Sequence, residues 1–170
     1  MSEFEKEFYA YLGLLSVRFA NMEYYLTSLL SMLLISDDDY LYPLTILENN
    51  NLNSNLDSLK KVNKIRGYEE QSISQMISEI RKVKDHRNLF IHGIWHVPKS
   101  NDGKFSVTCE KKKIKFEEDK NSRRKTWHHN SFHSYTLSEI KNKISKLDSI
   151  IRIQKRLISQ IEQDKWEQKF

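Results

Sequence analysis

The sequence predicts a mainly α protein, an up-and-down bundle of four to five helices with a small β-hairpin inserted before the last helix. The 170 residues include only 4 Gly and 2 Pro, and long tracts are rich in Leu, Ile, Lys, Glu and Ser. This composition favours helices over a many-turned β fold. Apolar residues also recur at spacings of three and four along several tracts, which is the period of a helix with one buried face.

One domain is expected over residues 1–170, because this length is typical of a single hydrophobic core and no Pro/Gly/Ser-rich linker interrupts it. Cys109 is the only cysteine, which excludes an internal disulfide and fits a reducing compartment. The N-terminus carries Glu3, Glu5 and Glu7 instead of a basic stretch before an apolar one, so no secretory leader is expected. The longest apolar tract, residues 26–35, is too short to span a bilayer. We therefore expect a cytoplasmic protein that does not enter a membrane.

A long helix is predicted over roughly the first thirty residues, because a single apolar stripe continues through them. The stripe consists of Phe4, Phe8, Leu12, Leu15, Phe19, Met22, Leu26, Leu29 and Leu33. The acidic run at 37–39 and Pro43 then break the pattern. Two shorter helices are expected around residues 41–47 and 52–65.

A second strong stripe predicts another long helix. Its members are Ile73, Met76, Ile77, Ile80, Val83, Arg87, Ile91 and Ile94. Ser72 with Gln75 forms a candidate capping box at its start, and Pro98 is expected to end it. Arg87 is therefore expected on the buried line of this helix.

A turn at residues 101–103 precedes two short segments with alternating side chains, 105–109 and 114–116, which predict a small hairpin. Residues 104–135 are expected to be an insertion made of this hairpin and a basic arm. Thr136 and Glu139 form a second candidate capping box, and an apolar stripe from Leu137 onward predicts a last helix that ends near Trp166.

The basic arm carries the whole charge excess of the chain. Residues 111–125 include eight basic and three acidic side chains, which gives +5, the same as the formal net charge of the protein. Such a block attracts a polyanion without reading its sequence. The candidate RNA-binding residues are Lys111, Lys112, Lys113, Arg123, Arg124 and Lys125. A solvated loop that only keeps the protein soluble is the alternative.

The segment 84–95 places chemically capable polar side chains within an otherwise apolar helix. Burying Arg87 without compensation would cost several kcal/mol. Glu23 on the first helix is a candidate partner, and a purely structural buried pair is one explanation. Asn88 and His92 are four apart and share a helix face, whereas Arg87 and His92 diverge by about 140°. A second copy, packed antiparallel across a two-fold axis, could bring Arg87 toward the partner's motif histidine, so a homodimer is expected.

Arg87-Asn88, three further residues and then His92-Gly93, late in a long helix, resemble the motif of the HEPN superfamily. The motif of that family is an Arg, four to six residues and a His, often with Asn after the Arg. Asp85 before the motif and Glu23 on a preceding helix strengthen the resemblance, which covers most of the chain. Family members silenced by a nucleotidyltransferase antitoxin usually have Tyr two residues after the His, a place that Ile94 takes here.

The resemblance implies metal-independent RNA cleavage, without a cofactor, in which the 2′-hydroxyl attacks the neighbouring phosphate. In that scheme His92 performs acid–base chemistry, because its ordinary pKa is near 6.5. The guanidinium of Arg87 stabilises charge on the phosphate oxygens. Asn88 orients His92 or binds the ribose, and Glu23 or Asp85 holds Arg87 in place.

Together these observations predict a homodimeric endoribonuclease that cuts single-stranded RNA, as a toxin or anti-phage effector, with an antitoxin or regulatory protein as a further partner. The alternatives are a catalytically inactive HEPN module that dimerises or binds a nucleotide or protein, and a basic helical RNA-binding protein. His128, His129 and His133 are interpreted as a solvent-facing or RNA-contacting loop, because a metal motif is missing and only one cysteine is present. Trp127, Phe132 and Tyr135 could stack on unpaired bases or pack the hairpin onto the helices.

Overall fold

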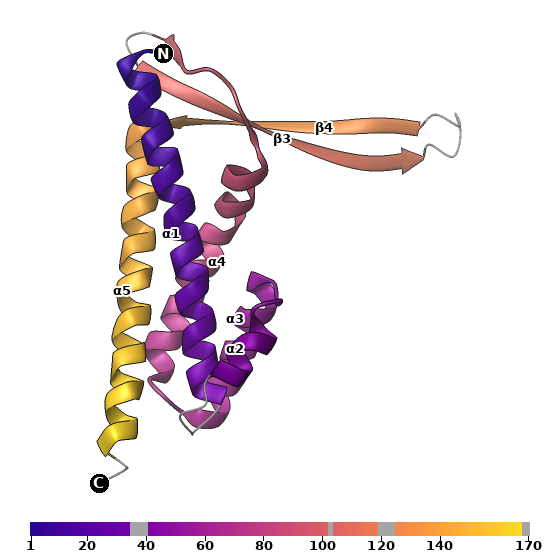
Figure 1. Cartoon of the computed structure of the whole chain (residues 1–170). Coiled ribbons are helices and arrows are strands. Elements are labelled where there is room, and N and C mark those ends of the chain that lie inside the picture. Colours follow the sequence, from indigo (N-terminus) through magenta and orange to yellow (C-terminus); the bar gives the residue numbers. More distant parts are fainter. Residues whose placement is uncertain (35–40, 102–103, 119–124, 168–170) are drawn as a thin grey trace. The chain divides into compact units, whose positions relative to one another are not determined.

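The computed structural model describes residues 1–34, 41–101, 104–118 and 125–167 (Figure 1). The described elements are, in order, α1 (Glu3–Leu34), α2 (Leu41–Leu47), α3 (Leu52–Arg66), α4 (Glu70–His92), β1 (Ile94–Trp95), β2 (Lys99–Asn101), β3 (Lys104–Glu118), β4 (Lys125–Thr136) and α5 (Leu137–Glu167). The mainly α class and the hairpin before the last helix are confirmed. Among the described residues, none of the helices is both long and apolar enough to cross a membrane.

The chain divides into two compact units. The sheet unit contains residues 1–16 and 84–143, and the helical unit contains residues 17–83 and 144–170. Three long helices, α1, α4 and α5, contribute one segment to each unit.

The core of the helical unit contains the part of the α1 apolar stripe that begins at Phe19. Met22, Leu26 and Leu29 are fully buried, as are Ile73 and Ile80 of α4. Two contacts show that α1 and α5 run in the same direction here. Arg18 forms an ion pair with Asp148 at 2.6 Å, and one α1 turn further on, Gln154 Nε2 donates to the Met22 carbonyl at 3.0 Å.

Local signals explain the ends of α3. The Asn51 side chain accepts a hydrogen bond from the Ser54 amide at 3.0 Å, which satisfies an N–H group that the first turn leaves unpaired. Gly67 follows the last residue with φ of 65°, a left-handed conformation that favours glycine. Arg66 Nε then donates to the Leu33 carbonyl at 3.1 Å and so satisfies an acceptor at the end of α1.

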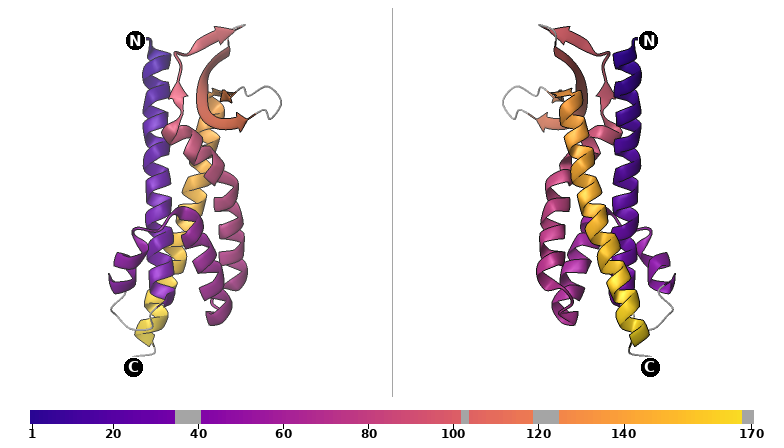
Figure 2. Two further views of the ribbon diagram at one scale, coloured as in Figure 1. Left: turned by 90° about the vertical axis from the view of Figure 1, so that its right-hand side faces the viewer. Right: turned by 90° about the vertical axis from the view of Figure 1, so that its left-hand side faces the viewer.

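In the sheet unit, β3 is the central strand of an antiparallel sheet. On one edge β1 and β2 pair with successive parts of β3, and β4 pairs along the other edge. The register shifts between Lys113 and Phe116, which indicates a bulge. A bulge bends a strand, and Figure 2 shows that β3 curves strongly along its length.

The predicted hairpin was wrong in its pairing. Segments 105–109 and 114–116 belong to a single strand, β3, and residues 125–135, expected in a basic arm or loop, form most of β4. Thr, Trp, His, Phe and Tyr are frequent in this second strand, and such residues fit a pleated, partly exposed surface. Long-range pairing with β3 therefore outweighs the local signal of the charged residues.

The predicted start of α4 was also wrong. The helix begins at Glu70, so Ser72 lies inside the first turn and its hydroxyl donates to Glu69 Oε2 at 2.8 Å. The second capping box is confirmed, because the Thr136 hydroxyl accepts from the Glu139 amide at 3.3 Å and Glu139 Oε2 accepts from the Thr136 amide at 2.7 Å. The Thr136 hydroxyl also donates to Glu139 Oε2 at 2.8 Å, and the hydrogen bonds from the Thr136 amide and hydroxyl lower the pKa of Glu139.

Candidate active site

The three predicted catalytic residues lie in the last two turns of α4, within the sheet unit. Arg87 is half-buried, and Asn88 and His92 are exposed. Arg87 Nη1 donates a hydrogen bond to Asn88 Oδ1 at 3.1 Å. His92 is the last residue of the helix, so its imidazole is presented where α4 ends.

The end of α4 is earlier than the apolar stripe predicts. Ile94 and Trp95 form β1 instead of continuing the helix, and the side chains of Ile91 and Ile94 are 42% and 48% exposed. The buried side chains of this last stretch are Leu89 and Phe90. The expectation that Arg87, Ile91 and Ile94 continue one buried line is thus corrected. The sheet packs beside the end of α4, so a different face of the helix is buried there.

Aromatic packing fixes the end of α4 against the sheet. The Phe90 ring lies 5.2 Å from that of Trp95 and 5.0 Å from that of Tyr135, and Phe8 of α1 lies 5.5 Å from Trp95. Trp95 Nε1 also donates to the Phe90 carbonyl at 3.2 Å, one of the acceptors that a helix end leaves unpaired. These four rings form an aromatic core that supports the end of α4, where the motif lies.

Gly93 permits the closest approach between the motif and the sheet. A Cβ atom at this position would lie 2.2 Å from Cys109 Sγ and 2.4 Å from the Leu89 carbonyl oxygen, both far inside van der Waals contact. The Gly93 amide donates to that same carbonyl at 2.8 Å. The glycine that follows the motif histidine is thus required by the packing of β3 on the helix end.

Cys109 is a packing residue at this junction. It is fully buried, and its thiol donates to the Leu89 carbonyl at a distance of 3.4 Å. Burial raises the pKa of Cys109 to about 11, so the thiol is neutral at physiological pH. This environment is opposite to that of a nucleophilic cysteine.

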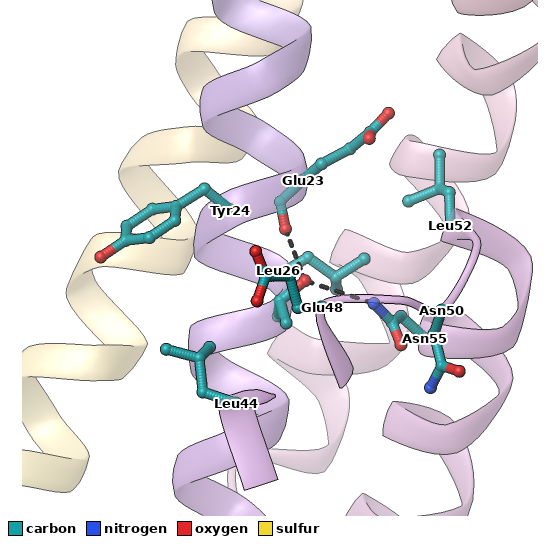
Figure 3. A pocket seen from close by; sticks show the side chains of 9 residues that line it. Glu23, Tyr24, Leu26, Leu44, Glu48, Asn50, Leu52 and Asn55 are labelled. Atoms are coloured by element: carbon teal, nitrogen blue, oxygen red, sulfur yellow. Dashed lines mark hydrogen bonds between the residues drawn. The ribbon is translucent and has the colours of Figure 1, made fainter. Parts of the chain in front are cut away.

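The two predicted supporting residues belong to different units. Asp85 is exposed on α4 in the sheet unit, and Glu23 is on α1 in the helical unit. The pairing of Glu23 with Arg87 stays a prediction. Within its own unit Glu23 borders a cavity of about 320 Å³ between α1, α2 and α3, which Figure 3 shows from close by. Thr27 on its wall donates to the Glu23 carbonyl at 3.0 Å and accepts from Asn55 Nδ2 at 3.2 Å.

The predicted RNA-binding residues fall on the β3–β4 hairpin. Lys111 and Lys112 are exposed on β3. Lys113 and Lys125 lie on β3 and β4, and their side chains are outside the described part of the structure. Arg123 and Arg124 lie outside the described residues. The arm is therefore in part a paired extension of the sheet instead of a loop.

The aromatic and histidine residues of the insertion separate into different environments. Tyr135 is buried in the aromatic core, Phe132 and His133 are exposed on β4, and the side chains of residues 127–129 lie outside the described part. In the described part of the chain, His, Cys, Asp and Glu side chains form no group of three or more that could hold a metal ion.

Sequence reasoning missed one polar pair. His96 Nε2 lies 3.1 Å from Glu110 Oε2, which joins the chain after β1 to the middle of β3. The two residues are fourteen apart in sequence, so only the β1–β3 register places them together, and no local motif marks them.

Comparison of the chain with models of known protein families, with curated proteins and with solved structures returned no match.

Proposed function

We propose that this protein is a HEPN-type endoribonuclease that cleaves single-stranded RNA without a metal ion. The observation that carries the proposal is the arrangement of Arg87, Asn88 and His92 at the end of α4, where Asn88 and His92 are exposed. The fold fixes this end through Gly93 and the aromatic core. Such rigid support is what a catalytic constellation requires, because small displacements of reacting groups greatly reduce the rate.

The proposed reaction is an internal transesterification. The 2′-hydroxyl loses its proton, O2′ bonds to the adjacent phosphorus, and the bond from phosphorus to O5′ breaks as O5′ gains a proton. The products are a 2′,3′-cyclic phosphate and a 5′-hydroxyl. One of the two proton transfers is assigned to His92 and the other to water, because an imidazole titrates near neutral pH.

The remaining roles follow from the donors that the helix end offers. The guanidinium of Arg87 stabilises the charge that develops on the phosphate oxygens. Asn88 accepts a hydrogen bond from Arg87 through its carbonyl oxygen, so it positions the guanidinium and leaves its NH2 group for the ribose or phosphate. Glu23 and Asp85 are kept as supporting carboxylates.

A composite site in a homodimer is part of the proposal. A focused site needs either a distorted helix or a second copy, because Arg87 and His92 diverge by about 140° on a regular helix. The second copy is favoured, since α4 is α-helical from Glu70 to His92. Ile91 and Ile94 supply exposed apolar surface beside the motif, which a two-fold contact would cover on both chains. Leu89 and Phe90 do not contribute to this contact, because both side chains are buried.

The basic hairpin retains the substrate in this scheme. Lys111 and Lys112 lie on the strand that packs against the helix end, and the remaining cations of the block follow along the chain. Basic side chains attract the RNA backbone irrespective of sequence. The biological role that fits such an activity is that of a cytoplasmic toxin or anti-phage effector restrained by an antitoxin or another regulatory protein.

Cleavage of labelled single-stranded RNA by the purified chain in EDTA tests the proposal. Arg87→Ala and His92→Ala should each lower the rate about 100-fold or more, the usual effect of losing an acid–base group or a charge-stabilising donor. Arg81→Ala on the same helix and His133→Ala on β4 are matched controls and should cut normally.

Full activity of both motif variants would refute the site assignment. If the wild-type chain dimerises but neither binds nor cuts RNA, the inactive HEPN module takes its place. If it binds RNA without cutting, the basic RNA-binding protein does.

A further inference from the structure

The face of the sheet opposite the aromatic core carries two rows of aligned side chains. Ile94, Glu110 and Phe132 are direct neighbours across β1, β3 and β4. In the next row Thr108 pairs with Ser134. The Thr108 carbonyl accepts a hydrogen bond from the His96 amide at 2.9 Å. Directly opposed residues of antiparallel strands point to the same side. We define Glu110, Phe132, Thr108, Ser134 and His96 as the outer face. Ile94, at the edge of the first row, belongs to the dimer contact proposed above.

An exposed aromatic ring stands on this face. The Phe132 side chain is 61% exposed, although Tyr135 three residues later is buried in the aromatic core on the other side of the sheet. A large apolar ring that faces water offers a flat surface for stacking. Unpaired nucleobases stack on such rings irrespective of their identity, because every base has a π-face.

A fixed histidine lies next to the ring. The Glu110 side chain is only 11% exposed, and its Oε2 lies 3.1 Å from His96 Nε2. A carboxylate so far removed from water needs a partner, so the pair holds the imidazole in place. The His96 side chain remains 43% exposed, and its ring centroid lies 6.3 Å from that of Phe132. The exposed part of the imidazole can therefore contact a ligand that stacks on Phe132.

Further polar groups and charge surround the pair. The Thr108 and Ser134 hydroxyls are 3.1 Å apart and can each donate or accept a hydrogen bond. Lys112 is exposed on the same side of β3, two residues beyond Glu110. It belongs to the basic block of residues 111–125, which has a net positive charge. An aromatic surface, base-reading groups and adjacent cations together match the base and phosphate of a nucleotide.

We propose that the outer face is a subsite for one unpaired nucleobase of a single-stranded RNA, in which Phe132 stacks on the base and His96 contacts its edge. Glu110 is a positioning residue that acts through His96. The subsite rests on the proposed function, since it assigns a substrate contact to the proposed nuclease. The charge of the neighbouring hairpin favours RNA over a second copy of the chain as the occupant.

Binding of two labelled strands to the full-length His92→Ala chain tests the subsite. One strand is a short oligoadenylate, and the other has the same sugar–phosphate backbone without bases. The parent chain should prefer the strand with bases. Phe132→Ala should remove about 5- to 100-fold of affinity from that strand alone. Phe132→Trp should keep the preference, and Phe105→Ala, which removes an exposed ring that stacks on Phe4, should not change it.

Equal losses for both strands, or binding of neither strand by the parent chain, would overturn the subsite. So would a Phe132→Ala chain that changes from dimer to monomer, because the face would then be an interface between copies. Glu110→Gln and His96→Ala should alter the preference among adenine, cytosine and uracil strands, and an unchanged preference excludes this pair. The binding result does not depend on cleavage. Equal cleavage of RNA by the wild-type chain and by the Phe132→Ala chain would refute the subsite alone.

Discussion

At the residue scale, Gly93 serves the fold next to a residue that is proposed to serve catalysis. The space for a side chain at this position is already taken by Cys109 Sγ and the Leu89 carbonyl. A thiol can rotate away from an added methyl group, but a helix carbonyl cannot move without distorting the last turn of α4. Glycine is therefore needed for close approach, not for an unusual backbone angle.

Gly93→Ala should lower the free energy of unfolding by about 1–3 kcal/mol, the usual range for overpacking. Chemical denaturation of the purified chain measures it. Cys109→Ala added to Gly93→Ala should recover part of the loss, because it removes the sulfur contact and leaves the carbonyl contact. Gly13→Ala on α1, where an added Cβ meets nothing within 4 Å, is the matched control and should not destabilise the chain. An unchanged stability of Gly93→Ala would contradict the close packing of β3 on the helix end.

The burial of single residues around the motif was only partly predictable. Periodicity identified the buried positions Ile73, Ile80 and Val83 correctly, because one face of the helix stays buried along this stretch. It failed at Ile91 and Ile94, which are exposed. Contacts with β3 and Trp95 decide burial at this end, and such long-range contacts leave no trace in a local pattern.

At the scale of elements, the presence of the helices and of a hairpin before the last one was predictable, and the pairing of the hairpin strands was not. A long apolar stripe marks α1, and the Thr136–Glu139 capping box marks the start of α5, so both helices are encoded by neighbours in sequence. The pairing of β3 with β4 depends on residues up to thirty apart, such as Ser106 and Thr136. Charged residues in the middle of β3 interrupt the alternating pattern from which a strand is predicted.

The basic hairpin is expected to contribute affinity without reading sequence. Reversing Lys111, Lys112, Lys113, Arg123 and Arg124 to Glu should weaken binding of single-stranded RNA and flatten its salt dependence by a slope of roughly 0.7 for each phosphate that the protein no longer neutralises. Fluorescence anisotropy at a series of salt concentrations measures both effects. The melting temperature should change little, because surface ion pairs contribute little to stability.

Reversal of Lys60 and Lys61, two exposed lysines on α3, is the control for charge reversal outside the hairpin. The same salt slope in the hairpin variant and the parent chain would restore the interpretation of the block as a solvated segment.

At the scale of the whole molecule, the chain divides into two compact units, whereas its length predicts a single domain. The two statements do not conflict, because a unit and a domain are defined by different properties. The units are defined by contacts, and the helices α1, α4 and α5 continue from one to the other. A domain is defined by independent folding. The single domain therefore stays a prediction. The pairing of Glu23 with Arg87 also stays a prediction, because the two residues belong to different units.

The candidate site could be identified from sequence as a set of residues, but its surroundings could not. The Arg87-Asn88-His92-Gly93 pattern identifies the candidate residues by itself, although the helix was expected to continue beyond them to Pro98. The contact of Asn88 with Arg87 and the packing role of Gly93 are visible only in the folded structure. The pair of His96 and Glu110 also required the register of the sheet.

Two inactive chains that restore each other provide the most direct test of a composite ribonuclease site. A heterodimer of one Arg87→Ala chain and one His92→Ala chain, isolated by two different tags after coexpression, contains one intact combination of Arg and His and one combination that lacks both. The account predicts about half of the wild-type cleavage rate per dimer, measured on single-stranded RNA in EDTA, whereas each variant homodimer stays inactive. A heterodimer as inactive as the two homodimers, or a wild-type chain that cleaves RNA as a monomer, would contradict it.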